Sequence, residues 1–212
     1  MLTRKRLANA ERRSQIIQVA MNLFASRGFK GTTTRAIAEA AGVSEAIIFR
    51  HFSTKEDLYN AIITTVLEHR NRIWEHDNIE GIEDLPDLMT RFGRIFIERS
   101  RKDQTFVRLM LYSALQDHKF RQRFFESNRN PYLRGIRERI ERGVDSGEFA
   151  PADPQLTTQS FFWSLLQYVV NRFVASAEIP PEKADGAYIT NLVAVYTRSL
   201  VPACKVDSEL TT

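Results

Sequence analysis

Apolar residues recur at three- and four-residue steps along most of this 212-residue chain. That spacing places them on one face of an α-helix, whereas a half-buried β-strand would alternate apolar and polar residues. The interruptions fall at Gly, Pro or clusters of Asn and Asp, which end helices and form turns. The pattern therefore predicts an all-α fold of about nine helices.

Particular residues mark where several of these helices begin. In the stretch STKE, Ser53 and Glu56 have the reciprocal spacing of a capping box. Asp153 before Pro154 is typical of an N-cap followed by the first helical residue. Pro131 is compatible with either the end or the start of a helix. The expected helices span roughly residues 11–27, 34–41, 44–52, 53–74, 85–100, 103–117, 120–146, 154–177 and 181–201.

Length and composition restrict the class of protein. The chain is long enough to bury one large core or two modest ones. It has no apolar run of membrane-spanning length and no secretory leader, which indicates a cytoplasmic protein. Its single cysteine, Cys204, excludes an internal disulfide framework and a thiolate metal cluster.

Positive charge is concentrated at the N-terminal end. Residues 1–55 contain ten Lys or Arg and three Asp or Glu, a net charge of +7, so the other 157 residues carry −3 of the total of +4. Such asymmetry is expected where one end of a chain faces a polyanion such as DNA. A solvated basic surface is the alternative, because charge alone does not exclude it.

Residues 34–52 have the features of a helix-turn-helix. Two helices that cross steeply over a tight turn need a small residue in the first helix, a turn residue such as Gly, and apolar contacts at the crossing. Ala38 supplies the small residue, and Gly42, which has no Cβ, supplies the turn. The residues spaced to close the small core are Ile37, Ala41, Val43, Ile48 and Phe52.

A helix over residues 44–52 would have a core face and an outward face. At about 100° per residue, Ser44, Ile48 and Phe52 fall on the core side. In a major groove, an outward Arg can donate to guanine or phosphate, an apolar side chain can touch a thymine methyl, and a Glu can accept from cytosine. The alternative is that the outward apolar residues pack on neighbouring helices and the Arg is only solvated. The outward set is Glu45, Ala46, Ile47, Phe49 and Arg50.

The stretch TTTRAIAEAAGVSEAIIFRHFSTKEDLY, with the preceding IIQVAMNLFASRGF, resembles the N-terminal DNA-binding domain of the TetR family of bacterial transcriptional regulators. The resemblance covers residues 12 to about 60. It implies that Ser44 caps the recognition helix. It also implies phosphate or groove-edge contacts by Thr34 and Arg35, and phosphate contacts by His51 and Lys55.

The chain differs from the pattern of the family it resembles at three positions of the recognition helix. Many members have Tyr where Phe49 stands, so a hydroxyl contact to phosphate is lost. Many have Gly or Pro where Ala46 stands. Glu45 is less usual than a basic or neutral residue and would repel phosphate, which suggests base readout or a salt bridge.

The segment TRKRLANAERR precedes the first expected helix. Its Arg4, Lys5 and Arg6 lie on an arm that could enter a minor groove. A disordered solubilising tail is an equally good interpretation.

Residues 56–212 form the second predicted domain, for ligand binding and dimerisation, after an N-terminal arm and helix-turn-helix domain over residues 1–55. It is rich in aromatic residues, which at helical spacing belong more often to a core than to a pocket. A helical bundle of this kind can nevertheless hold an apolar ligand, and the resemblance implies such a pocket lined by the middle helices. The ligand-binding candidates are Phe92, Phe96, Phe106, Tyr112, Phe125, Trp163 and Tyr168.

The last two long helices, containing SFFWSLLQYVVNRFVAS and YITNLVAVYTRSLV, have apolar residues on more than one face. A second apolar face exceeds what one-sided packing in a single subunit requires, which indicates a homodimer. The resemblance implies a four-helix interface about a two-fold axis, and pseudo-palindromic half-sites in the DNA. The dimerisation candidates are Phe161, Phe162, Leu165, Val169, Leu192 and Tyr196.

The sequence lacks the motifs of an enzyme. No carboxylate and third ligand accompany its four scattered histidines at metal spacing, and there is no phosphate loop, nucleophile motif or cysteine pair. We therefore expect no catalytic residue, metal or cofactor. The hypothesis is a dimeric repressor that leaves its operator when a small apolar or amphipathic ligand binds. The alternatives are an inducer-free regulator controlled by a protein partner or by abundance, and a helical carrier or enzyme with a basic N-terminus.

Overall fold

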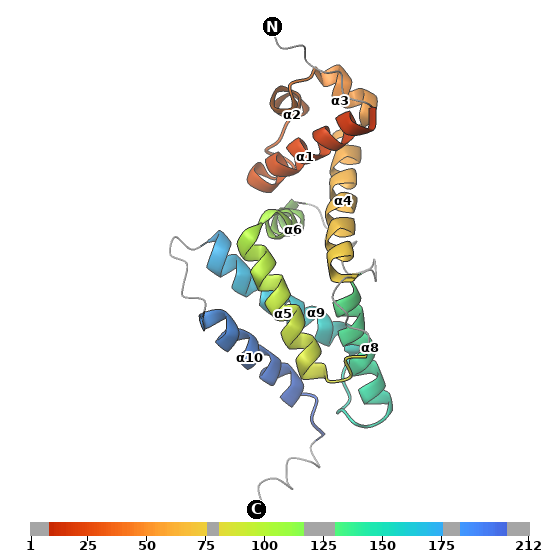
Figure 1. Ribbon diagram of the computed structural model, residues 1–212, viewed down its shortest axis with the longest axis vertical. Helices are drawn as coiled ribbons and strands as arrows, with labels where there is room; N and C mark the ends of the chain where they lie inside the picture. The colour runs from red at the N-terminus through yellow and green to blue at the C-terminus, as the bar shows by residue number, and fades with distance from the viewer. Residues whose placement is uncertain (1–8, 76–80, 117–129, 176–182, 203–212) are drawn as a thin grey trace, which may run out of the picture. The chain divides into compact units, whose positions relative to one another are not determined.

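The computed structural model describes residues 9–75, 81–116, 130–175 and 183–202, and these form α-helices, one short π-helix and no β-strand (Figure 1). The predicted all-α fold is confirmed. The elements are α1 (Asn9–Arg27), α2 (Thr34–Ala41), α3 (Glu45–His51), α4 (Lys55–Glu75), α5 (Leu85–Lys102), α6 (Thr105–Gln116), α8 (Pro131–Asp145), α9 (Pro154–Val169), the π-helix η1 (Val170–Val174) and α10 (Lys183–Arg198). None of the described helices has the length and apolar content needed to cross a bilayer.

The chain packs into two compact units. The first comprises residues 1–70 and 108–124, and the second comprises residues 71–107 and 125–212. The domain boundary predicted at residue 55 falls inside the first unit, where α4 begins.

The core of the first unit is built around Phe24 of α1, which is fully buried. Its ring centroid lies 5.7 Å from that of Phe29 and 5.3 Å from that of Tyr59 on α4. Phe29 reaches this position because Gly28 ends α1 with a positive φ of 71°, which a residue without Cβ adopts at little cost. The N–H of Gly28 donates to the carbonyl of Phe24 over 2.9 Å. The turn after α1 thus folds back on its own helix.

The start of α4 differs from the predicted capping box. Thr54, not Ser53, is the capping residue: its N–H donates to Asp57 Oδ2 over 3.1 Å, and the N–H of Asp57 donates to Thr54 Oγ1 over 3.0 Å. Phe52, which is 4% exposed, ends α3 with an extended backbone, so the chain turns into α4 one residue later than predicted. The reciprocal pair is the same, shifted by one position.

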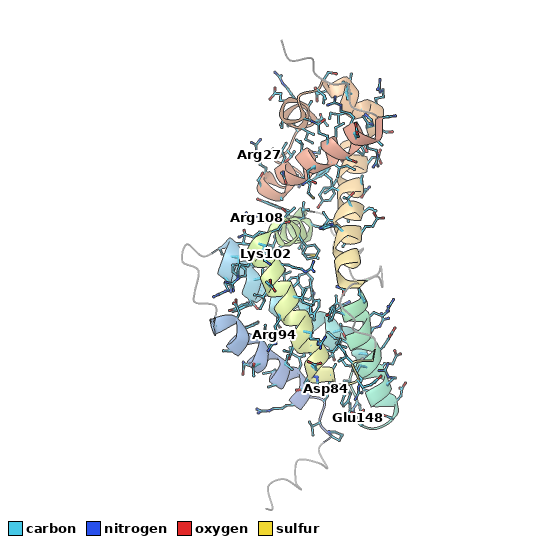
Figure 2. All side chains as sticks on the ribbon, in the orientation of Figure 1. Arg27, Asp84, Arg94, Lys102, Arg108 and Glu148 are labelled. Carbon is cyan, nitrogen blue, oxygen red and sulfur yellow. The ribbon has the colours of Figure 1, made fainter. Side chains whose placement is uncertain are left out.

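An aromatic core fills the second unit, where α5 packs against α8, α9 and α10. The ring of Phe92 lies within 6.4 Å, centroid to centroid, of the rings of Phe96, Tyr132, Phe161 and Phe162. All five side chains are at most 1% exposed. Figure 2 labels Asp84 and Lys102 at the two ends of α5. Asp84 caps that helix by accepting from the N–H of Asp87 over 3.0 Å.

Pro131 starts a helix rather than ending one. It is the first residue of α8, and Asn130 before it accepts from the N–H groups of Tyr132 and Leu133 over 3.1 and 3.2 Å. The predicted helix over 120–146 is therefore α8 from residue 131 onward, and residues 117–129, including the ligand candidate Phe125, lie outside the described residues.

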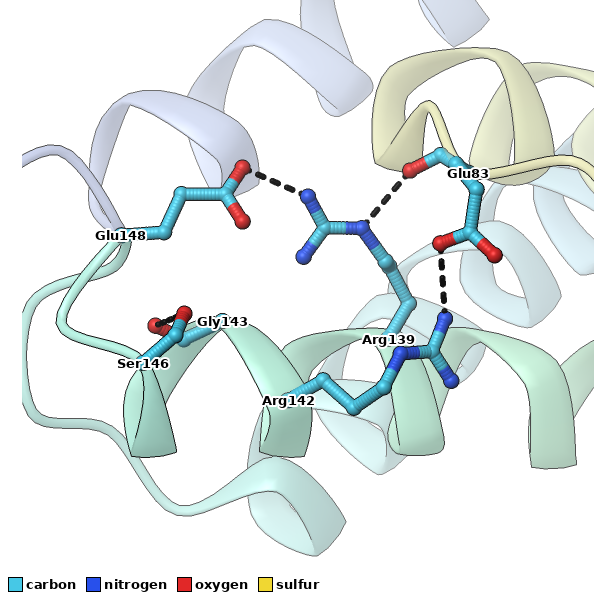
Figure 3. A network of polar contacts seen from close by, with 6 residues as sticks. All are labelled: Glu83, Arg139, Arg142, Gly143, Ser146 and Glu148. Carbon is cyan, nitrogen blue, oxygen red and sulfur yellow. Dashed lines mark hydrogen bonds and ion pairs between the residues drawn. The ribbon is translucent and has the colours of Figure 1, made fainter.

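The far end of α8 is held by a polar network (Figure 3). Arg139 donates from Nε to the carbonyl of Glu83 over 2.7 Å and from a terminal nitrogen to Glu148 over 2.5 Å. Arg142 donates to the Glu83 carboxylate over 3.0 Å. The network joins the segment before α5 to the turn after α8.

The predicted dimer surface on α9 is wrong for four of its residues. Phe161, Phe162, Leu165 and Val169 have no exposed surface in the isolated chain, so a partner subunit cannot touch them. A helix that is apolar all round can be satisfied by neighbours in its own subunit, and α9 is such a helix. On α10, Leu192 is also buried at 8% exposure, while Tyr196 is half-buried with its hydroxyl 3.2 Å from Ser164 Oγ.

Candidate nucleic-acid interface

The turn between α2 and α3 has the geometry that the sequence predicts. Gly42 has φ 64° and ψ 38°, in the left-handed region that favours glycine. Its N–H donates to Glu39, and the N–H of Val43 donates to Ala38 over 3.0 Å, so the last carbonyls of α2 are satisfied. At the other end of α2, Thr33 Oγ1 accepts from the N–H of Ala36 over 3.1 Å. These contacts fix where α3 begins.

The two faces of α3 are separated as predicted, with one exception. Ile48 and Phe52 are buried, at 1% and 4% exposure, together with Ile37, Ala38 and Ala41 of α2. Ser44, predicted on the core side, is exposed. On the outward face Glu45, Ala46, Phe49 and Arg50 are exposed and Ile47 is half-buried. Phe49 is 49% exposed, which leaves a large apolar ring in solvent next to an arginine.

Ser44 occupies the N-cap position of α3, but its side chain makes no capping hydrogen bond. The predicted capping role of its hydroxyl is therefore wrong. Its backbone carbonyl does accept from the N–H groups of Ile47 and Ile48, over 3.0 and 3.4 Å. The first turn of α3 is held through the main chain.

Two of the predicted contact residues on α2 already have partners within the protein. Thr34 Oγ1 donates to Glu45 Oε1 over 2.6 Å, which joins the first residue of α2 to the first residue of α3. Arg35 Nε lies 3.3 Å from Glu39 Oε1, and both side chains are exposed. The unusual Glu45 is thus held by a neighbouring hydroxyl.

Lys55, predicted to contact a phosphate from the start of α4, folds back toward α1. Its Nζ donates to the carbonyls of Phe29 and Thr32 over 3.0 and 3.2 Å, and lies 4.1 Å from the centre of the Phe29 ring. An ammonium has three donors, so a third can still reach a phosphate oxygen. Lys55 ties the connection between α1 and α2 to α4, whatever its role on DNA.

Sequence reasoning missed two arginines that α1 brings to the end of α3. The guanidinium carbon of Arg13 lies 4.8 Å from the centre of the Phe52 ring. Burial lowers the pKa of His51, and the charges of Arg50, Arg13 and Arg12 lower it further, in that order. The signal in the sequence is the pair Arg12–Arg13 beside the basic arm, but only the packing of α1 near α3 assigns it to this surface. Arg4, Lys5 and Arg6 of the arm lie outside the described residues.

The predicted ligand residues that the structure describes are divided between the two units. Phe92, Phe96 and Phe106 are buried in the core of the second unit. Trp163 is half-buried there. Tyr112 belongs to the first unit, where its hydroxyl donates to the carbonyl of Ser26 over 3.2 Å.

Tyr168 belongs to a charged cluster in the second unit that the sequence did not reveal. Its hydroxyl donates to Asp185 Oδ1 over 2.7 Å, and Arg172 Nε lies 2.6 Å from the same oxygen. Arg101 of α5 pairs with the other carboxylate oxygen. Burial and the bond to Asp185 raise the pKa of Tyr168 to about 12, so the phenol remains a donor at neutral pH. No three His, Cys, Asp or Glu side chains of the described residues are placed to hold a metal ion.

Two family patterns match the sequence. "Bacterial regulatory proteins, tetR family" matches residues 16–62, which contain the helix-turn-helix, and "AefR-like transcriptional repressor, C-terminal domain" matches residues 84–199. The second match covers more than half of the chain. The chain belongs to the TetR family. Its first match is the DNA-binding domain of a bacterial regulatory protein, and its second is a C-terminal domain of the AefR-like repressor type.

Relatives of this TetR-family chain include the HTH-type transcriptional repressor AcnR of Corynebacterium glutamicum, 28% identical over 78% of this chain and 83% of the relative. Among solved structures, FadR from Bacillus subtilis in complex with stearoyl-CoA covers 88% of this chain and 98% of its own, with 20% identity and a TM-score of 0.65. AibR in complex with isovaleryl coenzyme A and operator DNA covers 87% and 97%, with 19% identity and a TM-score of 0.64. At identities of 19–20%, these structural similarities show a shared fold and no more.

Proposed function

We propose that this TetR-family repressor binds a pseudo-palindromic operator as a homodimer, with α3 of each protomer in a major groove. The observation that carries the proposal is the outward face of α3, where Phe49 is 49% exposed beside the exposed Arg50 while Ile48 on the opposite face is buried. The N-terminal 55 residues, with their charge of +7, supply the attraction to a polyanion.

Each side chain of the interface has a proposed role that fits its position. The exposed Arg50 donates to guanine or to a phosphate, and Ala46 and Ile47 contact thymine methyl groups. Phe49 contributes an apolar contact in place of a tyrosine hydroxyl. The residues proposed to contact phosphates or the groove edge are Thr34, Arg35, Ser44, His51 and Lys55, and Glu45 is proposed to read a base.

We further propose that the second unit binds an acyl-coenzyme A. Support comes from two structural neighbours, which were solved in complex with stearoyl-CoA and with isovaleryl coenzyme A. The described core of this unit is rich in aromatic side chains, which suits an acyl chain. A ligand that prefers one of two conformations weakens operator binding by that difference in affinity.

The proposed dimer surface includes the exposed face of α10. Val195 is 56% exposed there and offers an apolar side chain to a partner helix. The buried α9 residues named above are excluded from this surface. Dimerisation would give the two recognition helices the two-fold symmetry of an operator.

DNA binding is tested with Arg50→Ala and Lys55→Ala on a duplex selected by the protein from a random-sequence pool. Loss of a base contact weakens binding by about 1–3 kcal/mol, and loss of a phosphate contact lowers the salt slope by about one. Arg91→Ala is the control, because Arg91 is on α5 in the second unit and pairs with Asp87. Wild-type affinity in both variants would contradict these site assignments.

The ligand is tested by titrating stearoyl-CoA and isovaleryl-CoA into the protein–DNA complex. Release of DNA at ligand concentrations that also saturate the free protein supports the proposal. If neither compound binds, the result favours the alternative hypothesis of a regulator without a small-molecule inducer. If the protein binds acyl-CoA but no selected duplex, the carrier alternative replaces the repressor.

A further inference from the structure

Four cationic or potentially cationic side chains meet where α1 approaches the end of α3. Arg12 and Arg13 lie near the start of α1, and Arg50 and His51 lie in the last turn of α3. The Arg13 guanidinium carbon lies 4.8 Å from the centre of the Phe52 ring, and the centroid of the His51 ring lies 6.4 Å from the same ring. The Phe52 ring is therefore a common neighbour of a cation of α1 and the imidazole of α3.

Arg12 is oriented by contacts that lead to α2. One of its terminal nitrogens donates to Gln15 Oε1 over 2.6 Å, and Gln15 Nε2 donates to the carbonyl of Ala41 over 3.4 Å. Ala41 is the last residue of α2. An arginine held in this way loses less conformational freedom when it binds an anion.

The causes that lower the pKa of His51 indicate how an anion bound to the cluster would change that pKa. Its pKa is lowered by burial and then by Arg50, Arg13 and Arg12. The acidic groups of the neighbouring helices have partners of their own: Glu39 of α2 pairs with Arg35, and Asp57 caps α4. A phosphate among the arginines would offset their positive potential and favour protonation of the imidazole.

We propose that Arg12, Arg13 and His51 form a DNA-phosphate site where α1 meets the end of α3, and that His51 takes up a proton from solvent as the phosphate binds. The proposal rests on the DNA-binding function proposed above. It adds two contacts from α1 to the recognition helix. It also makes operator binding dependent on pH.

The sign of the pH dependence follows from proton linkage. In the free protein burial and then the arginines lower the pKa of His51, and in the complex the phosphate raises that pKa. A group that gains a proton on binding makes affinity increase as pH falls. The gain is about tenfold for each pKa unit by which the complex raises the value, in each protomer.

The first test compares wild type and His51→Gln on the selected duplex between about pH 5.5 and 8. Wild-type affinity should increase toward low pH, and the glutamine variant should be nearly independent of pH, because its amide does not titrate. NMR titration of the His51 ring should give a higher pKa in the complex than in the free protein, a readout that a purely structural histidine would not move. Equal pH dependence in both proteins, or an unchanged His51 pKa, would overturn the proton uptake.

The second test measures the salt slope of binding for Arg12→Ala and Arg13→Ala. Each should lower the slope by about one, whereas Arg91→Ala should leave it unchanged. Arg13→Lys keeps the charge and should keep the slope, which separates a phosphate contact from packing against Phe52. Thermal unfolding confirms that each variant is folded.

The outcomes distinguish the two proposals. If the wild-type protein binds no duplex in the selection, the DNA-binding function fails and this site fails with it. If the wild type binds DNA but the α1 variants behave like Arg91→Ala, the phosphate site is wrong and the repressor function stands.

Discussion

Glu45 places a negative charge on the outward face of α3, where it accepts a hydrogen bond from Thr34. The carboxylate lies 2.6 Å from the Thr34 hydroxyl on an exposed surface that we propose faces DNA. We expect Glu45→Gln to increase affinity for unrelated duplexes by roughly two- to tenfold at low salt, because one repulsive charge is removed. Discrimination between the selected duplex and its variants should fall if the carboxylate accepts from a cytosine.

The comparison for this residue is Glu98→Gln, an exposed carboxylate of α5 that pairs with Lys102. It changes the net charge equally, so any difference between the two variants comes from position. Binding measured by fluorescence anisotropy on both duplex types is sufficient. Equal effects of the two substitutions would show that Glu45 acts only through net charge.

At the scale of a single element, α8 depends on the glycine in its last turn. A Cβ at Gly143 would lie 2.1 Å from a ring carbon of Phe149, whose N–H donates to the Gly143 carbonyl over 2.9 Å. The guanidinium carbon of Arg139 lies 4.7 Å from the centre of the same ring. Arg139 also donates to Glu148 in the adjoining turn (Figure 3). Gly143→Ala should therefore lower the free energy of unfolding by about 1–3 kcal/mol.

Gly186 of α10 is the matched control for that substitution. Beyond its chain neighbours and its own helix backbone, no atom lies within 4 Å of the position its Cβ would take, so Gly186→Ala should stabilise the protein by up to about 1 kcal/mol through helix propensity. Chemical unfolding of both variants measures whether each substitution raises or lowers the free energy of unfolding. Stabilisation by Gly143→Ala would mean that the Phe149 ring moves aside without cost.

The end of a helix is predictable where a single residue type determines it. It is less predictable where two adjacent residues could serve equally well and tertiary packing selects one. Gly42 ends α2 at the predicted residue because few other residues adopt its φ of 64°. The start of α4 was displaced by one residue because Ser53 and Thr54 are each followed by an acid three positions later. The apolar α9 was assigned to a dimer because its pattern does not say which chain covers it.

The candidate site was predictable to the extent that it lies on one helix. The helical period of α3 identified Glu45, Ala46, Phe49 and Arg50 as outward residues. Contacts between helices could not be found in this way. The approach of α1 to the end of α3, which brings Arg13 to Phe52, depends on tertiary packing and leaves no periodic signal.

At the scale of the molecule, a single carboxylate links four elements of the second unit. Asp185 at the start of α10 pairs with Arg101 of α5 and with Arg172 of η1, and accepts from Tyr168 of α9. Arg172 is 3% exposed, so its charge is costly to leave without this anion. Asp185→Asn should destabilise the protein by roughly 3 kcal/mol, with cooperative unfolding of the second unit measured by urea.

Glu98→Gln serves again as the comparison, because its ion pair with Lys102 is exposed and should contribute little. The Asp185 variant isolates the buried charge from the hydrogen bonds, since Asn retains a carbonyl that can accept. A loss of stability no larger than that of Glu98→Gln would show that the cluster is well compensated by its surroundings.

In α3, the residues that attach the helix to the core differ from the residues that face outward. This separation affects how such a repressor can acquire new DNA targets. Seven residues form too short a helix to be stable alone, and Ile48 and Phe52 attach it to the core. The exposed residues Glu45, Ala46, Phe49 and Arg50 contribute little to that attachment, and substitutions at such positions usually change stability by less than about 0.5 kcal/mol. Operator preference can therefore diverge among descendants of this chain, or be redesigned in the laboratory, while the fold that presents it is left intact.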